Sequence, residues 1–456
     1  MAYRDEICEK SQFSFVEFAK NAKIKCNKLR FKYVFSLQVV VKQRLIKKKL
    51  NIMNKRLSVG LSVLSFGAIT WFVSSCETLP TPSAGSNSLE KPNLPASLYD
   101  YSVGVIKGNA MDIKSFLQNN AVNKTGGFGN VFFDPSFGAS DPELLEAADK
   151  YSNASVQLGR VLFYDKKLSL NNMVSCGSCH HQKVGFSDAM ASSIGFGGQK
   201  TSRNSMAICN PIFFNNMFWD SRAAGTLDLS TKPVFNHIEM GMENDAMLEQ
   251  KLAAVSYYPA LFSAAFGDDK VTRNRISMAI SHFLSSMITG NSKFDAVSAG
   301  TQQYSQLEQM GHDLFFSDRA RCSRCHAGDN LSAPDMPGDP YGAPTVKGTA
   351  NIGLERQYKD PGKENGNFRI PSLRNIELTG PYMHDGRFAN LNQVIDHYSH
   401  GVQPHSHLDK NLKDNQGNPV KLNFSELEKD ALIAFLRTLT DNKFITDPRF
   451  SDPFAN

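Results

Sequence analysis

The 456-residue chain has little of several features that would each indicate a class of protein. It has only eight cysteines, three of them in the first 76 residues, so a disulfide framework is not expected. Few segments alternate apolar and polar residues with a period of two, which argues against an extensive β-sheet. The longest apolar run falls short of the ~20 residues that a transmembrane helix needs.

Most of the chain also lacks an excess of basic over acidic residues, although the formal net charge of the whole chain is +6. Residues 1–76 hold 15 Lys and Arg against 4 Asp and Glu, which leaves 35 against 40, a net charge of −5, for the remainder. This distribution gives no indication of nucleic-acid binding.

The basic excess belongs to a targeting segment. A cationic start at Met53–Arg56 is followed by an apolar run that ends in Val73-Ser74-Ser75-Cys76. Residues 53–76 therefore resemble a bacterial lipoprotein signal peptide, with Cys76 as the lipidated mature N-terminus. A transmembrane anchor is the alternative, and either places the rest outside the cytoplasm, in the periplasm. Residues 1–52 are expected to be a non-native upstream extension, with translation starting at Met53.

Composition and periodicity divide the rest of the chain. Residues 77–97 are rich in Pro, Ser, Asn and Gly and predict a flexible linker, and residues 98–150 predict an N-terminal helical extension. Residues 151–300 and 301–456 each open with an amphipathic helical pattern, which predicts two related, mainly α-helical domains. A closing helix is expected over residues 425–439, with Ser425 and Glu428 as its capping box.

Two copies of Cys-x-x-Cys-His carry the strongest chemical signal. They are Cys176-Gly177-Ser178-Cys179-His180 and Cys322-Ser323-Arg324-Cys325-His326. This spacing is a c-type haem attachment signal, in which two thiols bond the haem vinyl groups and the His binds the iron. A zinc or redox site fits less well, because each pair ends in His. The sequence thus predicts two covalent haems c, and the remaining Cys209 is expected to be a small buried hydrophobe.

Six further stretches lie in order over about residues 150–445. They are Leu158–Phe163, Arg203–Ser205, Phe218–Arg222, Ile238–Met240, Pro371–Asn375 and Pro381–Gly386. With the two haem motifs, they make the chain similar to the bacterial di-haem cytochrome c peroxidases and their MauG-type relatives. The resemblance implies a mainly α fold with two cytochrome c-like haem domains packed around a di-haem interface.

The resemblance also implies how the first haem is used. A removable distal His of the peroxidases corresponds to Phe196, which cannot bind iron, so this haem is expected to be open for peroxide. His181 and His237 are weaker alternative ligands. Glu239 matches the distal acid/base, because a carboxylate over the iron can move a proton between the peroxide oxygens. Leu229 departs from the family, which usually has a Gln there.

Residues around the second haem are assigned in the same way. Trp219 matches the residue that relays electrons between the haems. The second-haem ligand is Met in many peroxidases, and the matching position here is Tyr398, as in MauG-type enzymes. A phenolate lowers the potential, whereas Met raises it. Alternative ligands at this haem are Met383, His397 and His400.

One Ca²⁺ is implied between the domains, held by the Asn204 side chain and the backbone carbonyls of Thr379 and Pro381. Oxygen ligands of this kind suit Ca²⁺. Asn204 could instead cap a turn.

The leading expectation for function is a peroxidase. H₂O₂ would be reduced at the His180 haem, with electrons from a small cytochrome or cupredoxin arriving through the His326 haem and Trp219. A MauG-type oxidase of a protein or small molecule and a non-enzymatic di-haem electron carrier are the alternatives. The lipid anchor implies membrane association, and a homodimer is compatible with the resemblance.

Overall fold

The computed structural model describes residues 90–106, 109–121, 142–214, 216–333 and 348–455. These residues belong to one unit, Ser86–Asn456, which is separate from Met1–Gly85. The expected upstream extension, signal peptide and Cys76 all lie outside the described residues. Within the described ranges, no helix combines the length and the apolar character that crossing a membrane requires.

The described residues are rich in helix, as the sequence predicts, and their strands form only three antiparallel pairs. The pairs are β1 (Val103–Ile106) with β2 (Asn109–Asp112), β3 (Asn216–Met217) with β4 (Ala223–Ala224), and β5 (Thr349–Ala350) with β6 (Phe368–Arg369). The first pair lies in the segment expected to be helical. It is followed there by α4 (Ile113–Ala121) and, after a gap, α5 (Pro142–Leu145).

A first group of helices surrounds α6 (Asn153–Tyr164) and α11 (Arg273–Ser286). The predicted helix before the first haem motif is thus confirmed as α6, capped by Ser152. Val156, Leu158, Val161 and Leu162 are fully buried, and every other residue from Ser155 to Tyr164 is buried too, because α6 packs against both α11 and α10. Four more helices belong to this group: α7 (Gly225–Ser230), α8 (Lys232–Phe235), α9 (Asp245–Ala253) and α10 (Tyr258–Phe266).

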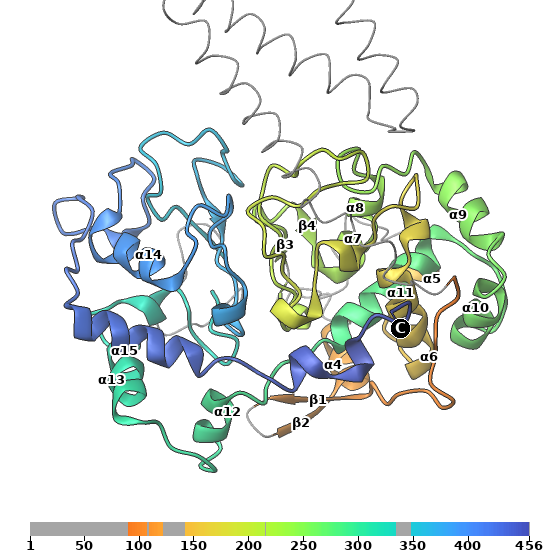
Figure 1. Ribbon diagram of the computed structural model, residues 1–456, viewed down its shortest axis with the longest axis horizontal. Helices are drawn as coiled ribbons and strands as arrows, with labels where there is room; N and C mark the ends of the chain where they lie inside the picture. The colour runs from red at the N-terminus through yellow and green to blue at the C-terminus, as the bar shows by residue number, and fades with distance from the viewer. Residues whose placement is uncertain (1–89, 107–108, 122–141, 215, 334–347, 456) are drawn as a thin grey trace, which may run out of the picture. The chain divides into compact units, whose positions relative to one another are not determined.

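A second group surrounds α13 (Gln306–Phe315) and α15 (Glu426–Arg437). Both helices were expected, and the predicted capping box of Ser425 and Glu428 is formed. α12 (Lys293–Ser298) precedes this pair, and α14 (Leu391–Asp396) follows the second haem motif. Figure 1 shows α13, α14 and α15 together at one end of this unit, away from α6, α9 and α10.

The two groups share the same close helix crossing. A Cβ added to Gly159 of α6 would lie 1.8 Å from the Ala279 carbonyl oxygen of α11, and one added to Gly311 of α13 would lie 1.8 Å from the Ala431 carbonyl oxygen of α15. In both cases the next obstacle is the Cβ of a Phe, Phe283 or Phe435. Only glycine allows these backbones to approach so closely. The internal repeat expected from the sequence is therefore visible as a repeated helix crossing.

The C-terminal segment does not stay with the second group. After α15 the chain returns to the first hydrophobic cluster, where Phe444, Phe450 and Phe454 are buried. The Tyr164 hydroxyl donates to the Phe450 carbonyl at 2.7 Å, and Arg160 Nε donates to the Ser451 carbonyl at 2.7 Å. Residues 441–455 thus follow the second group in the sequence but pack against the first group.

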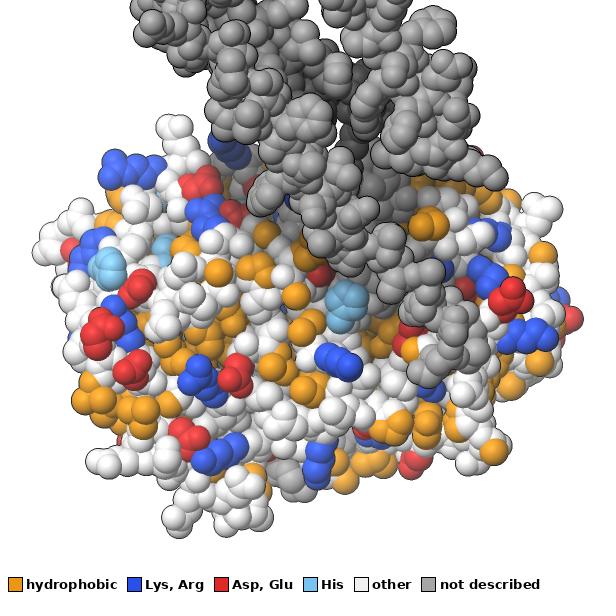
Figure 2. All heavy atoms as spheres, viewed as in Figure 1, with side chains coloured by type: hydrophobic (Ala, Val, Ile, Leu, Met, Phe, Trp, Pro, Cys, Tyr) orange, Lys and Arg blue, Asp and Glu red, His pale blue; other side chains and the backbone are white. Residues whose placement is uncertain are grey.

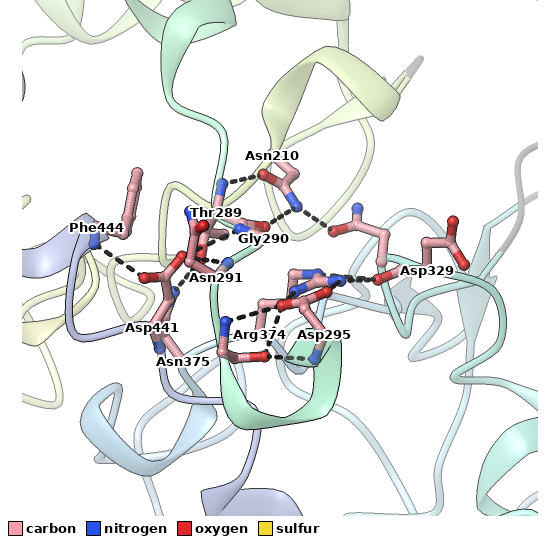
Figure 3. A network of polar contacts seen from close by, with 12 residues as sticks. Asn210, Thr289, Gly290, Asn291, Asp295, Asp329, Arg374, Asn375, Asp441 and Phe444 are labelled. Atoms are coloured by element: carbon pink, nitrogen blue, oxygen red, sulfur yellow. Dashed lines mark hydrogen bonds and ion pairs between the residues drawn. The ribbon is translucent and has the colours of Figure 1, made fainter. Parts of the chain in front are cut away.

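A buried polar network joins the two groups (Figure 3). Arg374 makes two hydrogen bonds to Asp295, at 2.8 and 2.9 Å, and two more to the Asp329 carbonyl in the loop that follows His326. Asp441 accepts hydrogen bonds from the backbone of Gly290 and Asn291, between α11 and α12. Asn210 Nδ2 donates to the Asn330 side chain at 3.2 Å, so the network joins the segment after the first haem motif to the loop that follows His326.

Candidate haem cavities and active site

The first haem motif begins in a tight 3₁₀ turn, Cys176–Ser178. The backbone N–H of Cys179 donates to the Cys176 carbonyl at 3.1 Å, and that of His180 donates to the same carbonyl at 3.0 Å. This turn puts both thiols and the imidazole on one side, where Cys176, Cys179 and His180 line a cavity of about 480 Å³. The volume lies in the range of ligand sites.

The His180 ring is set for binding a metal. Its Nδ1 lies 2.8 Å from the Phe186 carbonyl oxygen, which can only accept, so Nδ1 carries the proton. Burial lowers the pKa of His180 and keeps the ring neutral. The unprotonated Nε2 is then the atom able to bind iron.

The second motif repeats this arrangement. Cys322–Arg324 form the same turn, and the His326 N–H donates to the Cys322 carbonyl at 3.0 Å. His326 Nδ1 lies 3.1 Å from the Leu331 carbonyl oxygen, and burial lowers the pKa of His326 to about 4. Cys322, Cys325 and His326 line a second cavity, of about 210 Å³.

The thiols in both cavities fit covalent haem attachment. Burial raises the pKa values of Cys176, Cys322 and Cys325 to about 12, so these sulfurs are neutral. A thioether is also neutral and is compatible with an apolar wall, whereas a buried thiolate would be costly. Each cavity therefore offers two neutral sulfurs beside an imidazole whose Nε2 is unprotonated, which is the set of groups that holds haem c.

Glu239 lines the first cavity together with His180. Burial raises the pKa of its carboxyl group, although the nearby charge of Arg222 opposes this. Asn236 Nδ2 donates to Glu239 Oε1 at 2.8 Å, while Asn236 Oδ1 accepts from the backbone N–H of Ile238 at 2.9 Å. Asn236 thus caps the turn and fixes Glu239, leaving Oε2 as the oxygen able to exchange a proton.

The first haem was expected to keep one coordination position open, so the side chains that line its cavity are the ones that could occupy that position. The Phe196 ring packs against Gly241, and Phe196, His181 and His237 are not among the described residues that line this cavity. Leu229 does line it. Three methionines line it as well, Met206, Met217 and Met240, and a thioether is a possible haem ligand that sequence reasoning did not consider.

The two cavities share a wall. Trp219 lines both, and its indole N–H donates to the Asn204 carbonyl at 2.9 Å. The Arg369 N–H donates to the Trp219 carbonyl at 2.7 Å, which fixes the backbone on the other side. Asn204, Arg369 and Cys209 also line both cavities, and Cys209 is buried, as expected. Trp219 is therefore held between the two haem motifs.

Tyr398 lines the second cavity with His326. It lies in a π-helical turn, His397–Gly401, which continues α14. Such turns recur at functional sites, because they displace one side chain from the regular helix. Burial raises the pKa of Tyr398. Of the alternative ligands, Met383 also lines this cavity, whereas His397 is bonded to the Ile352 carbonyl at 3.0 Å and His400 is exposed.

The three residues expected to hold Ca²⁺, Asn204, Thr379 and Pro381, all line the second cavity. The Asn204 amide nitrogen donates to the Met190 carbonyl at 2.9 Å. The amide oxygen is thus the atom of this side chain that remains for a cation.

Two residues of the site were missed in the sequence, and only one of them, Asn236, could have been found there. Asn236 precedes Glu239 by three positions, the spacing of a side chain that caps a turn and bonds back to it. Arg369 lies just before the Pro371–Asn375 stretch, but only the fold shows that it reaches both cavities. The roles of the three methionines had no signal, since buried Met is common in protein cores.

Comparison with known proteins identifies relatives of this chain. The family described as di-haem cytochrome c peroxidase matches residues 153–303. The chain is 32% identical over 313 residues to cytochrome c551 peroxidase of Nitrosomonas europaea, covering 67% of this chain and 86% of that protein. It is 30% identical to the methylamine utilization protein MauG of Methylorubrum extorquens, covering 64% of this chain and 80% of that protein.

A solved structure is similar too. It is a MauG-like protein associated with microbial copper homeostasis, with a TM-score of 0.59 and 35% identity, covering 66% of this chain and 93% of the other. The extent of these matches, the two haem motifs and the paired cavities lead to one conclusion. The chain belongs to the di-haem cytochrome c peroxidase and MauG family, and it is an oxidoreductase of the peroxidase type with two c-type haems.

Proposed function

We propose that H₂O₂ is reduced to water in the first cavity, with Glu239 as the acid/base. The observation that carries this proposal is the contact between Asn236 and Glu239 inside the cavity lined by His180. A half-buried carboxyl group held by one oxygen has a fixed direction and a raised pKa, as proton transfer near neutral pH requires.

The proton steps follow from the orientation of Glu239. Reduction of one H₂O₂ to two H₂O consumes two electrons and two protons. A haem bonded to Cys176 and Cys179, with His180 as iron ligand, would supply the redox-active metal for this reaction. Glu239 Oε2 would take the proton from one peroxide oxygen and return it to the other, which leaves as water. Asn236 keeps Oε1 occupied, so the proton moves through one oxygen only.

Electrons are proposed to enter through the second cavity. A small cytochrome or cupredoxin would donate electrons to a haem held by Cys322, Cys325 and His326, and Trp219 would carry them across the shared wall. The position of Trp219 in both cavity linings supports this path. We further propose that each helix group is a cytochrome c-like domain, in agreement with the repeated Gly159 and Gly311 crossings.

A second candidate is a MauG-type oxidase, which would use peroxide to oxidise a protein or small molecule. Tyr398 in the second cavity favours it, because a phenolate ligand lowers the potential of this haem and makes it a poorer electron acceptor. The 35% identity to a MauG-like protein supports the same reading.

Three further assignments complete the proposal. Ca²⁺ is held by Asn204, Thr379 and Pro381, which share the second cavity. The protein is periplasmic, and Cys76 attaches it to the membrane. The location and the membrane anchor are both inferred from the sequence alone.

Steady-state kinetics with reduced cytochrome c and H₂O₂ test the proposal. The account expects turnover in the haem-loaded protein and its loss in Glu239→Gln. If peroxide is consumed in single turnovers but reduced cytochrome c is not oxidised, the MauG-type reading replaces the leading one. Absence of any reaction with peroxide contradicts both.

A further inference from the structure

A second hollow of about 320 Å³ adjoins the first cavity beside Glu239. We call it the vestibule. It shares part of its lining with the first cavity, including Glu239, Asn236 and Phe218. A molecule in the vestibule therefore lies next to the proposed acid/base. The other residues that line it are Arg222, Lys232, Pro233, Phe235, His237 and Arg273.

The vestibule lining carries an excess of positive side chains, although residues 77–456 as a whole do not. Arg222, Lys232 and Arg273 line it, and Glu239 is the only carboxylate among its described lining residues. Residues 77–456 have a net charge of −5. On the face shown in Figure 2, Lys and Arg are interspersed with Asp and Glu. Composition alone does not explain why the cations gather here.

The acidic partners of these cations lie outside the vestibule lining. Arg222 pairs with Asp220 at 2.8 Å, Lys232 with Asp228 at 2.9 Å and Arg273 with Asp245 at 3.5 Å. Each pair thus presents its positive end to the hollow. Such oriented pairs create a local potential that attracts anions, even where the net charge is small.

Aromatic rings complete the lining. The Arg222 guanidinium carbon lies 3.6 Å from the centre of the Phe218 ring, and that of Arg273 lies 5.5 Å from the centre of the Phe235 ring. Phe218 has a φ of +66°, which is rare for a bulky side chain and shows that the surrounding structure holds it in place. A flat apolar ring with a negative substituent would complement the phenylalanine rings and the arginine cations of this lining.

We propose that the vestibule binds a single-ring aromatic anion, a phenol that carries a carboxylate, and that the enzyme oxidises it directly. This inference rests on the proposed peroxidase function. Two phenols each lose one electron and the hydroxyl proton, and one H₂O₂ takes up both electrons and both protons to give two H₂O and two phenoxyl radicals. Neutral H₂O₂ gains nothing from the cations, whereas an anionic second substrate is attracted by them.

Binding can be tested apart from turnover. Benzoate, which has no oxidisable hydroxyl, is titrated calorimetrically into the haem-loaded ferric protein, with neutral benzamide as the control ligand. We expect saturable binding of benzoate that weakens roughly fivefold in Arg273→Gln, since one exposed cation contributes at most about this much. Arg437→Gln, an exposed cation on α15, is the matched control and leaves binding unchanged. Equal binding of both ligands, or no effect of Arg273→Gln, overturns the proposal.

Turnover separates this proposal from the function on which it rests. Peroxide-dependent oxidation of 4-hydroxybenzoate is expected to exceed that of 4-hydroxybenzamide in kcat/KM at low salt, and Arg273→Gln reduces the difference about fivefold. If reduced cytochrome c is oxidised but the two phenols react alike, only the vestibule proposal fails. If neither cytochrome c nor phenol is oxidised, the proposed function fails, and the benzoate titration still decides whether the site exists.

Discussion

The surroundings of His180 and His326 differ much less than the open sides of their cavities. Both imidazoles donate Nδ1–H to a backbone carbonyl a few residues downstream, and both follow a helix with a glycine at its crossing. The first cavity adds Glu239 and Asn236, whereas the second adds Tyr398 and Met383. One scaffold is thus used twice, and we propose that the other residues lining each cavity set the role of its haem.

The largest effect is expected when the acid/base is removed from the first cavity. Glu239→Gln keeps the shape but cannot accept a proton, so kcat/KM for H₂O₂ should fall about 10²- to 10⁴-fold. Stopped-flow measurement of the reaction with peroxide checks this. The second-cavity variant Tyr398→Phe is the control, and an equal loss there would show that the two cavities do not divide the work.

The next largest effect is expected on stability, from the buried ion pair between Arg374 and Asp295. Burial by itself would raise the pKa of Asp295, but the hydrogen bonds and charge of Arg374 outweigh it and lower the pKa. Arg374→Met leaves this carboxylate buried without its partner and should lower the free energy of unfolding by about 3–5 kcal/mol. Urea unfolding of the haem-loaded protein measures it.

An exposed ion pair provides the control for that experiment. Arg437 and Glu377 are 63% and 37% exposed, so Arg437→Met should change stability by less than about 1 kcal/mol. Similar losses in both variants would contradict a special role for the buried network.

Because the helix crossing is repeated, replacing the glycine in either group should lower the stability of the protein by a similar amount. Gly159→Ala and Gly311→Ala each force a methyl group into a facing carbonyl and should cost about 1–3 kcal/mol or more. Haem content and thermal unfolding of the two variants are compared. If one variant is as stable as the parent protein, the two crossings are not equivalent.

A smaller effect is expected for the residue that positions Glu239. Asn236→Ala removes an N–H that stabilises the ionised carboxylate, so the raised pKa of Glu239 should rise further. Because the ionised form accepts the proton, activity is lost as pH falls through this pKa, and the acid limb of the profile moves to higher pH. We expect a roughly tenfold lower rate below that limb, from one charged hydrogen bond. An unshifted limb would contradict the positioning role.

Much of this comparison could be predicted from the sequence. The Cys-x-x-Cys-His motifs, the helices before them and the Ser425 cap depend on local spacing, which a sequence states directly. The return of Phe444 and Phe450 to the first group, and the shared wall at Trp219 and Arg369, are contacts between distant segments and leave no local pattern. Asn236 stands three positions before Glu239, a local spacing from which its capping role can be predicted.

Low-temperature electron paramagnetic resonance of the ferric, haem-loaded protein distinguishes an open first haem from a capped one. We expect a high-spin signal from one haem, which H₂O₂ abolishes, and a low-spin signal from the other. Two low-spin haems at rest would contradict it. The first iron would then be capped by a side chain such as Met206, Met217 or Met240, and the two cavities would not differ in the way proposed.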